Sequence, residues 1–330
     1  MSASSSRDRK PNPSREEAAL RSYFPAMKLL PDKQFHSDVA FRQTGEHFAV
    51  ISENNMISLF DVATCNLVKS IPNRKYQCNK LLFHPDSVRI ILNSFNDNDH
   101  KARLLNVDTD GFDLYYTGPN GQITSMATTD ACLFTVSEDE CLHVFDVKTA
   151  EVITRIDCPR ETQVATHPNG KCIVLADTSS VSLFDIRNMD QSVCSIHFSP
   201  GCKVAPHFGE IGNNLLITGS KYAKLHSLRD LSVIRTFAQL EDEFFTTGAC
   251  FTADEKFALV GSSDNSILAY DVPHSRKDTP LSEKTVLTGH ISPVKGIAVS
   301  NKYFNMVSFG EDCLFWSVDI ESFNNLGYKE

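Results

Sequence analysis

The chain repeats one stretch four times, as Ile51-Ser-Glu-Asn-Asn-Met-Ile-Ser-Leu-Phe-Asp61, Val136-Ser-Glu-Asp-Glu-Cys-Leu-His-Val-Phe-Asp146, Leu175-Ala-Asp-Thr-Ser-Ser-Val-Ser-Leu-Phe-Asp185 and Gly261-Ser-Ser-Asp-Asn-Ser-Ile-Leu-Ala-Tyr-Asp271. In each copy an apolar strand runs into a polar turn, and a second strand ends on an aromatic residue and an aspartate. The final aspartates lie two, one and two units of roughly 40 residues apart, the length of a four-stranded propeller blade. The repeat therefore predicts an all-β propeller.

Seven units of this kind can be aligned, so we expect a single seven-bladed ring spanning residues 20–320. The second and fifth units are irregular, because they lack the aromatic-aspartate ending. The predicted units are 38–71, 78–118, 123–156, 163–196, 203–237, 247–287 and 294–320. Residues 1–19 are polar and are predicted to be a disordered tail, in preference to a nuclear-import signal, because their basic residues are dispersed. Residues 321–330 form a predicted C-terminal tail.

A closed ring must join its last blade to its first, because an open sheet edge promotes aggregation. The last unit leaves little chain beyond it, whereas an apolar segment, Tyr23-Phe-Pro-Ala-Met-Lys-Leu-Leu30, precedes the first. We therefore expect residues 23–30 to supply the outer strand of the seventh blade.

Composition narrows the class of protein further. Apolar residues make up 41% of the 330 residues, enough to bury a large core without disulfides or a metal. None of the 10 cysteines forms a Cys-x-x-Cys pair or a cluster at zinc spacing, so no metal or cofactor is expected. The formal net charge of −9 argues against direct nucleic-acid binding. No membrane segment or signal peptide is visible, which favours a soluble intracellular protein.

Several short motifs resemble the WD-repeat family. They are Gly289-His290, the aromatic-aspartate endings Phe60-Asp61, Phe145-Asp146, Phe184-Asp185 and Tyr270-Asp271, and the turns His84-Pro-Asp86 and His167-Pro-Asn-Gly170. In that family an aspartate, a serine or threonine, a histidine and a tryptophan form a buried hydrogen-bond network. Asp312 lies four residues before the single tryptophan, Trp316, whereas Asp139 lies six before Phe145. This spacing argues against a complete network even in the last blade, and apolar packing is expected to hold most blades.

A closer resemblance extends over residues 20–320. It is carried by Leu20-Arg-Ser-Tyr23, Arg74-Lys-Tyr76, Asn79-Lys-Leu-Leu-Phe-His84, Ala249-Cys-Phe-Thr-Ala-Asp254, Val260-Gly-Ser-Ser-Asp264 and the end from Phe309 to Trp316. These motifs are similar to the WD-repeat subunits of COMPASS-type SET-domain histone H3 lysine methyltransferase complexes and of PNUTS protein phosphatase complexes. The resemblance implies a nuclear scaffold in RNA polymerase II transcription and termination. Its implied partners are a SET-domain methyltransferase subunit, a phosphatase scaffold and RNA polymerase II.

The residues themselves suggest one binding surface. The turns between the second and third strands of the blades meet at one rim of a propeller, and here they are rich in acidic residues. A rim of this charge would attract a basic peptide, although acidic residues also suit tight turns. Asp139 and Asp312 also lie in these turns, and the positive charge of Lys221 opposes the acidic residues. The candidate partner-binding residues are Glu53, Asp97, Asp99, Glu138, Glu140, Asp177, Asp264 and Glu311.

An enzyme is not expected. His84 and His167 precede proline in matching turns, which indicates repeat elements, and no nucleophile elbow or phosphate loop accompanies them. The sequence therefore favours a non-catalytic nuclear scaffold. Two alternatives remain open: a substrate receptor of a ubiquitin ligase or another cytoplasmic adaptor, and a propeller enzyme whose site is assembled from distant loops.

Overall fold

A computed structural model describes residues 20–29, 36–52, 54–96, 98–197, 204–219, 222–239, 248–272, 285–300, 302 and 304–319. The predicted tails, 1–19 and 321–330, lie outside the described residues.

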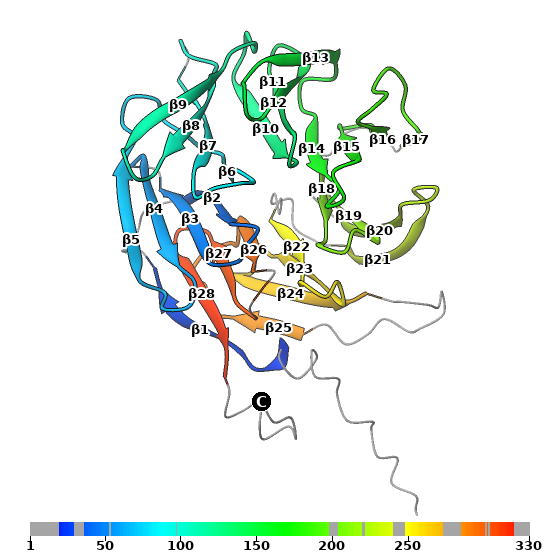
Figure 1. The fold of residues 1–330 in the computed structure, drawn as a ribbon. Coiled ribbons are helices and arrows are strands. Elements are labelled where there is room, and N and C mark those ends of the chain that lie inside the picture. The colour runs from blue at the N-terminus through cyan, green and yellow to red at the C-terminus, as the bar shows by residue number, and fades with distance from the viewer. Residues whose placement is uncertain are drawn as a thin grey trace, which may run out of the picture.

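Within the described residues, 28 strands form seven antiparallel sheets of four strands, arranged as blades around a ring (Figure 1). The seven-bladed all-β prediction is confirmed. Blade 1 contains β2 (His36–Phe41), β3 (His47–Ser52), β4 (Met56–Asp61) and β5 (Leu67–Pro72). Blade 2 contains β6 (Leu81–Phe83), β7 (Ile90–Asn93), β8 (Ala102–Asn106) and β9 (Gly111–Tyr116). Blade 3 contains β10 (Ile123–Thr128), β11 (Cys132–Ser137), β12 (Cys141–Asp146) and β13 (Val152–Asp157). Blade 4 contains β14 (Gln163–Thr166), β15 (Cys172–Ala176), β16 (Ser180–Asp185) and β17 (Cys194–His197). Blade 5 contains β18 (Val204–Phe208), β19 (Asn214–Gly219), β20 (Tyr222–Ser227) and β21 (Val233–Gln239). Blade 6 contains β22 (Ala249–Phe251), β23 (Phe257–Gly261), β24 (Ser266–Asp271) and β25 (Thr285–Thr288).

Blade 7 combines the two ends of the described chain. Its three inner strands are β26 (Gly296–Val299), β27 (Met306–Phe309) and β28 (Cys313–Val318), and its outer strand is β1 (Tyr23–Lys28). Tyr23 pairs with Val318, and Lys28 pairs with Leu314. The N-terminal strand therefore closes the ring, within the range 23–30 that the sequence suggested.

The core lies between the blades, because each sheet is covered on both sides. On β3, Phe48 and Val50 pack toward blade 7, whereas Ala49 and Ile51 pack toward blade 2. Seven such clusters of buried residues occupy the seven boundaries between neighbouring blades of the described ring. This two-sided burial explains why the second strands of the blades, such as β3, β15 and β23, are nearly continuous apolar runs.

The repeated aspartates end the third strand of their blades and cap the turn that follows. Asp61 Oδ1 accepts hydrogen bonds from Thr64 N (2.8 Å) and Thr64 Oγ1 (2.7 Å), and Asp146 Oδ1 accepts them from Lys148 N (2.8 Å) and Thr149 N (2.9 Å). These bonds favour the ionised form, so they lower the pKa of both carboxyl groups. The repeat signature therefore has a structural cause in turn capping.

Blade 7 contains a complete buried hydrogen-bond network, so the expectation drawn from the residue spacing was wrong. Trp316 Nε1 donates to Ser308 Oγ (2.7 Å), Ser308 Oγ donates to His290 Nε2 (2.6 Å), and His290 Nδ1 donates to Asp312 Oδ1 (2.7 Å). Burial lowers the pKa of His290, which favours this neutral ring.

The prediction from the residue spacing failed because it assumed the same geometry for every turn. Asp312 is the last residue of its turn, directly before β28, whereas Asp139 is the middle residue of the turn before β12. Trp316 is the fourth residue of β28, whereas Phe145 is the fifth of β12. Both changes shorten the separation in sequence, and the side chains still meet.

Candidate partner-binding face

The antiparallel order of the strands sends two kinds of segment to the same end of the ring. One is the turn between the second and third strands of a blade, and the other is the connection from its outer strand to the next blade. We call this end the connection face. The remaining two turns of each blade lie on the opposite face. A binding surface at the connection face therefore combines turns and connections.

The predicted acidic residues that are described all lie on turns of the connection face. Glu53 and Asp97 lie outside the described residues. Four side chains, at Glu138, Glu140, Asp264 and Glu311, are exposed, whereas Asp99 and Asp177 are half-buried. The structure thus places these six residues on one face, around the ring from blade 2 to blade 7.

Several of these carboxylates already have partners within their own turns. Asp177 accepts hydrogen bonds from Ser179 and Ser180 (2.6–2.8 Å). Partial burial opposes ionisation, but the bonds from both serines outweigh it and lower the pKa of Asp177. Asp264 accepts from Ser266, and Asp99 forms an ion pair with Arg103. These three carboxylates therefore stabilise turns as well as carrying charge.

Two further acidic residues of the same turns are structural. Asp139 accepts hydrogen bonds from Ser137 Oγ and from Asn120 N (2.8 Å), which joins its turn to the preceding connection. Asp312 is 2% exposed and belongs to the blade 7 network. Asp312 therefore adds nothing to the surface charge of the rim.

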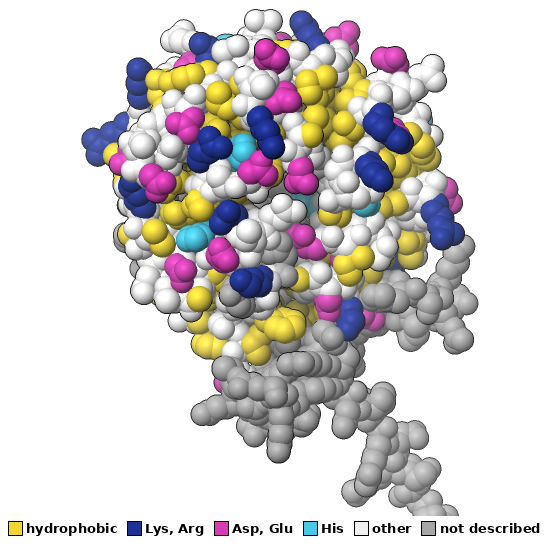
Figure 2. Space-filling view, viewed as in Figure 1, with side chains coloured by type: hydrophobic (Ala, Val, Ile, Leu, Met, Phe, Trp, Pro, Cys, Tyr) yellow, Lys and Arg dark blue, Asp and Glu magenta, His cyan; other side chains and the backbone are white. Residues whose placement is uncertain are grey.

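Basic side chains share the connection face. The connections contribute Arg74, Lys75, Lys80, Arg160 and Lys295, and Lys101 ends the long turn of blade 2. Arg160 Nη2 lies 3.7 Å from Glu138 Oε2. Sequence reasoning counted only the turns, and so it missed the cations of the connections. On the face of the molecule seen in Figure 2, basic and acidic side chains are likewise interspersed.

The centre of the ring opens on the connection face as a cavity of about 630 Å³. Asp38, Lys80, His207 and Lys295 are among its lining residues. Burial raises the pKa of Asp38, against the effects of nearby Lys80 and a hydrogen bond from Leu81 N. Burial lowers the pKa of His207 to about 4. No sequence signal grouped these residues, because they come from different blades.

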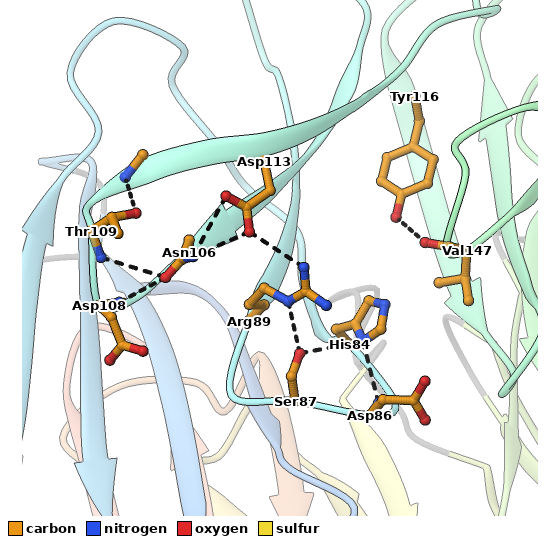
Figure 3. A network of polar contacts seen from close by, with 11 residues as sticks. His84, Asp86, Ser87, Arg89, Asn106, Asp108, Thr109, Asp113, Tyr116 and Val147 are labelled. Carbon is orange, nitrogen blue, oxygen red and sulfur yellow. Dashed lines mark hydrogen bonds and ion pairs between the residues drawn. The ribbon is translucent and has the colours of Figure 1, made fainter.

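The two histidines interpreted as repeat elements lie on the opposite face. His84 Nδ1 accepts a hydrogen bond from Asp86 N (3.2 Å), beside the Arg89 contacts to Ser87 and Asp113 (Figure 3). His167 Nδ1 accepts from Asn169 N (3.1 Å), while its Nε2 donates to the Gly212 carbonyl (2.8 Å). Both rings therefore support their own turns or a neighbouring blade.

The described ranges contain no group of three His, Cys, Asp or Glu side chains placed to hold a metal ion. They also contain no helix with the length and apolar content needed to span a membrane.

The closed ring, the capped turns and the blade 7 network together define a seven-bladed β-propeller whose last blade resembles a WD repeat. No protein-family model matches the chain. The chain is 23% identical over 300 residues to COMPASS component SWD2 of Saccharomyces cerevisiae, a match that covers 84% of this chain and 89% of that protein. It is 20% identical over 311 residues to WD repeat-containing protein 82 of Drosophila melanogaster, covering 91% of this chain and 96% of that protein. The resemblance of the sequence motifs to WD-repeat subunits of COMPASS-type complexes is confirmed.

Proposed function

We propose that this chain is a WD-repeat scaffold subunit of a COMPASS-type histone H3 lysine methyltransferase complex in the nucleus. The observation that carries the proposal is the similarity to COMPASS component SWD2 across 84% of the chain, which includes most of the ring. A rigid closed ring with many surface loops suits a subunit that holds other proteins together. In this role the chain binds the SET-domain subunit and contributes no chemistry of its own.

The family resemblance extends the proposal to a second assembly. In that assembly the chain binds a PNUTS-type phosphatase scaffold and acts with RNA polymerase II in transcription termination. The support is the similarity to WD repeat-containing protein 82 of Drosophila melanogaster over 91% of the chain. One ring can serve both assemblies if both scaffolds present a similar segment to it.

Depletion of the protein tests the proposed function. Histone H3 lysine methylation at active promoters is expected to fall, while the purified chain alone shows no methyltransferase or phosphatase turnover. Termination defects, measured as transcription beyond gene ends, report on the second assembly. Unchanged methylation and unchanged termination after depletion would favour a ubiquitin-ligase receptor or another adaptor. Turnover by the purified chain would favour an enzyme.

We further propose that the acidic turns of the connection face guide a basic partner segment. Glu140 and Glu311 carry this proposal best, since both are exposed and lie on turns of blades 3 and 7. The N-terminal tail of histone H3 is a suitable basic probe, because the proposed complex acts on it. Surface charges act mainly on the association rate and on its dependence on salt.

Glu140→Lys combined with Glu311→Lys is expected to lower the association rate of an H3 tail peptide several-fold at low salt. The difference should vanish at high salt, because salt screens exposed charges. The matched control is Glu151→Lys with Asp190→Lys, which makes the same change in net charge at exposed residues of the opposite face. Stopped-flow fluorescence measures both rates. Equal association rates for the two double variants would mean that the acidic residues form turns and do not guide a partner.

A further inference from the structure

Two loops of the connection face are joined at the boundary between blades 1 and 2. One is the connection 73–80, and the other is the turn after β7, of which 94–96 and 98–101 are described. Phe95 N donates to the Tyr76 carbonyl (3.2 Å), and Ser94 Oγ donates to the same oxygen (3.0 Å). The two loops therefore form one preformed surface.

A buried arginine stacks beneath this surface. The guanidinium carbon of Arg103 lies 3.7 Å from the ring centroid of Tyr76 and 5.6 Å from that of Tyr115. Its side chain is 4% exposed and forms an ion pair with Asp99. Stacking of a guanidinium on aromatic rings holds both partners in fixed orientations. Tyr76 also meets Phe112 edge to face, at 5.4 Å between centroids.

The Arg103 guanidinium has donor capacity that the described chain does not use. Its Nε and Nη1 are buried and have no acceptor among the described residues. A buried N–H without an acceptor costs free energy, so such groups in native proteins often mark a functional site. Strand β8 thus brings an incompletely paired guanidinium under the two loops.

Two large aromatic residues near the stack are exposed: Tyr115, whose ring lies by Arg103, and Phe95, whose backbone N–H bonds to the Tyr76 carbonyl. Phe95 is 47% exposed and Tyr115 is 46% exposed, although most aromatic residues of the described ring are buried. Exposed aromatic side chains on a rigid support are favourable anchors for binding, since little conformational entropy is lost when they are covered. We call Tyr76, Phe95, Arg103 and Tyr115 the aromatic patch.

Basic residues surround the aromatic patch. Arg74, Lys75 and Lys101 are exposed on the two loops, and the Lys75 ammonium lies 5.1 Å from the Tyr76 ring centroid. Asp99, the carboxylate described on these loops, is paired with Arg103. The surface of the patch is therefore apolar at its centre and positive at its edge, which complements an acidic segment with an apolar anchor.

We propose that the aromatic patch is a docking site for a short acidic segment of a partner protein, which places one large apolar side chain between Phe95 and Tyr115. This inference rests on the proposed scaffold function and specifies how the ring captures a partner. Segments of this kind order on binding, and the ring itself loses little entropy. The acidic residues of the segment contact Lys75, Lys101 and Arg74.

Selection of a randomised 12-residue peptide display library on the full chain tests the proposal. The enriched peptides are expected to share one Leu, Ile, Phe or Trp flanked by Asp and Glu. Phe95→Ser with Tyr115→Ser should weaken their binding at least about tenfold, the loss typical of removed anchors. The matched control is Val152→Ser with Ile153→Ser, side chains of blade 3 that are 47% and 57% exposed. It should change binding less than about twofold.

Charge reversal gives a second arm that leaves the aromatic side chains in place. Lys75→Glu with Lys101→Glu should lower affinity about tenfold at low salt, whereas Lys171→Glu with Arg229→Glu, exposed on the opposite face, should have little effect. The proposal would be overturned if the enriched peptides are basic or if no peptide is enriched. It would also be overturned if the peptides bind the double serine variant and the double glutamate variant as tightly as they bind the unchanged chain. The isolated chain is used throughout, so these outcomes are independent of whether a COMPASS-type complex forms.

Discussion

A chain that begins at residue 30 is expected to lose at least about 4 kcal/mol of unfolding free energy relative to a chain that begins at residue 20. The shorter chain lacks β1 and so exposes one edge of β28. It also lacks Leu20 and Leu29, which are 2% and 8% exposed and pack in the clusters on either side of blade 7. Urea unfolding followed by circular dichroism measures the difference.

The longer truncation has its own control. A chain that begins at residue 20 loses none of the described residues, so its melting temperature should stay within about two degrees of the full chain. Leu20→Ala in the full chain should account for about 2 to 4 kcal/mol of the loss on its own. Equal melting temperatures for the two truncations would mean that the ring is closed without β1.

Removal of the Asp312 carboxylate is expected to cost about 2 to 4 kcal/mol of unfolding free energy. Asp312→Ala leaves His290 Nδ1 buried without its acceptor, and it also removes the acceptor of Ile291 N (3.3 Å). A buried donor without a partner loses more than the net value of one hydrogen bond. Trp316→Phe should cost less, about 1 to 2 kcal/mol, because it removes one donor and keeps an aromatic side chain.

Asp264→Ala is the matched control for the network. Asp264 also lies on a turn before the third strand of its blade, but it is exposed and bonds within that turn. Its removal should cost less than about 1 kcal/mol. If Asp312→Ala and Asp264→Ala destabilise the chain equally, the blade 7 network has no special role in holding the ring together.

The ring could be predicted from the sequence because its causes are local and repeated. Asp61, Asp146 and Asp185 recur because each caps the turn after the third strand of its blade. The apolar runs recur because each middle strand is covered on both sides. Both effects act within about 40 residues and therefore leave a periodic trace in the sequence.

The proposed binding surface was harder to predict because it depends on segments that do not repeat. Lys75 and Arg160 lie in connections that differ in length and composition from blade to blade. The strand position of Arg103 is also polar in four other blades, so the residue itself gave no distinct signal. Its stack on Tyr76 links strand β8 to a connection that lies far from it in the chain. The acidic residues lie in turns that recur from blade to blade, so their position on one face could be predicted from the sequence. The positions of the neighbouring basic residues could not be predicted in this way.

Affinity purification of the tagged full chain from nuclear extract, with mass spectrometry of the bound proteins, tests the scaffold assignment most directly. The assignment predicts that a SET-domain histone methyltransferase copurifies and that the eluate methylates histone H3, while the chain purified alone does not. A phosphatase scaffold in the same eluate would support the second assembly. Cullin-linked partners with no methyltransferase and no phosphatase scaffold would contradict the assignment.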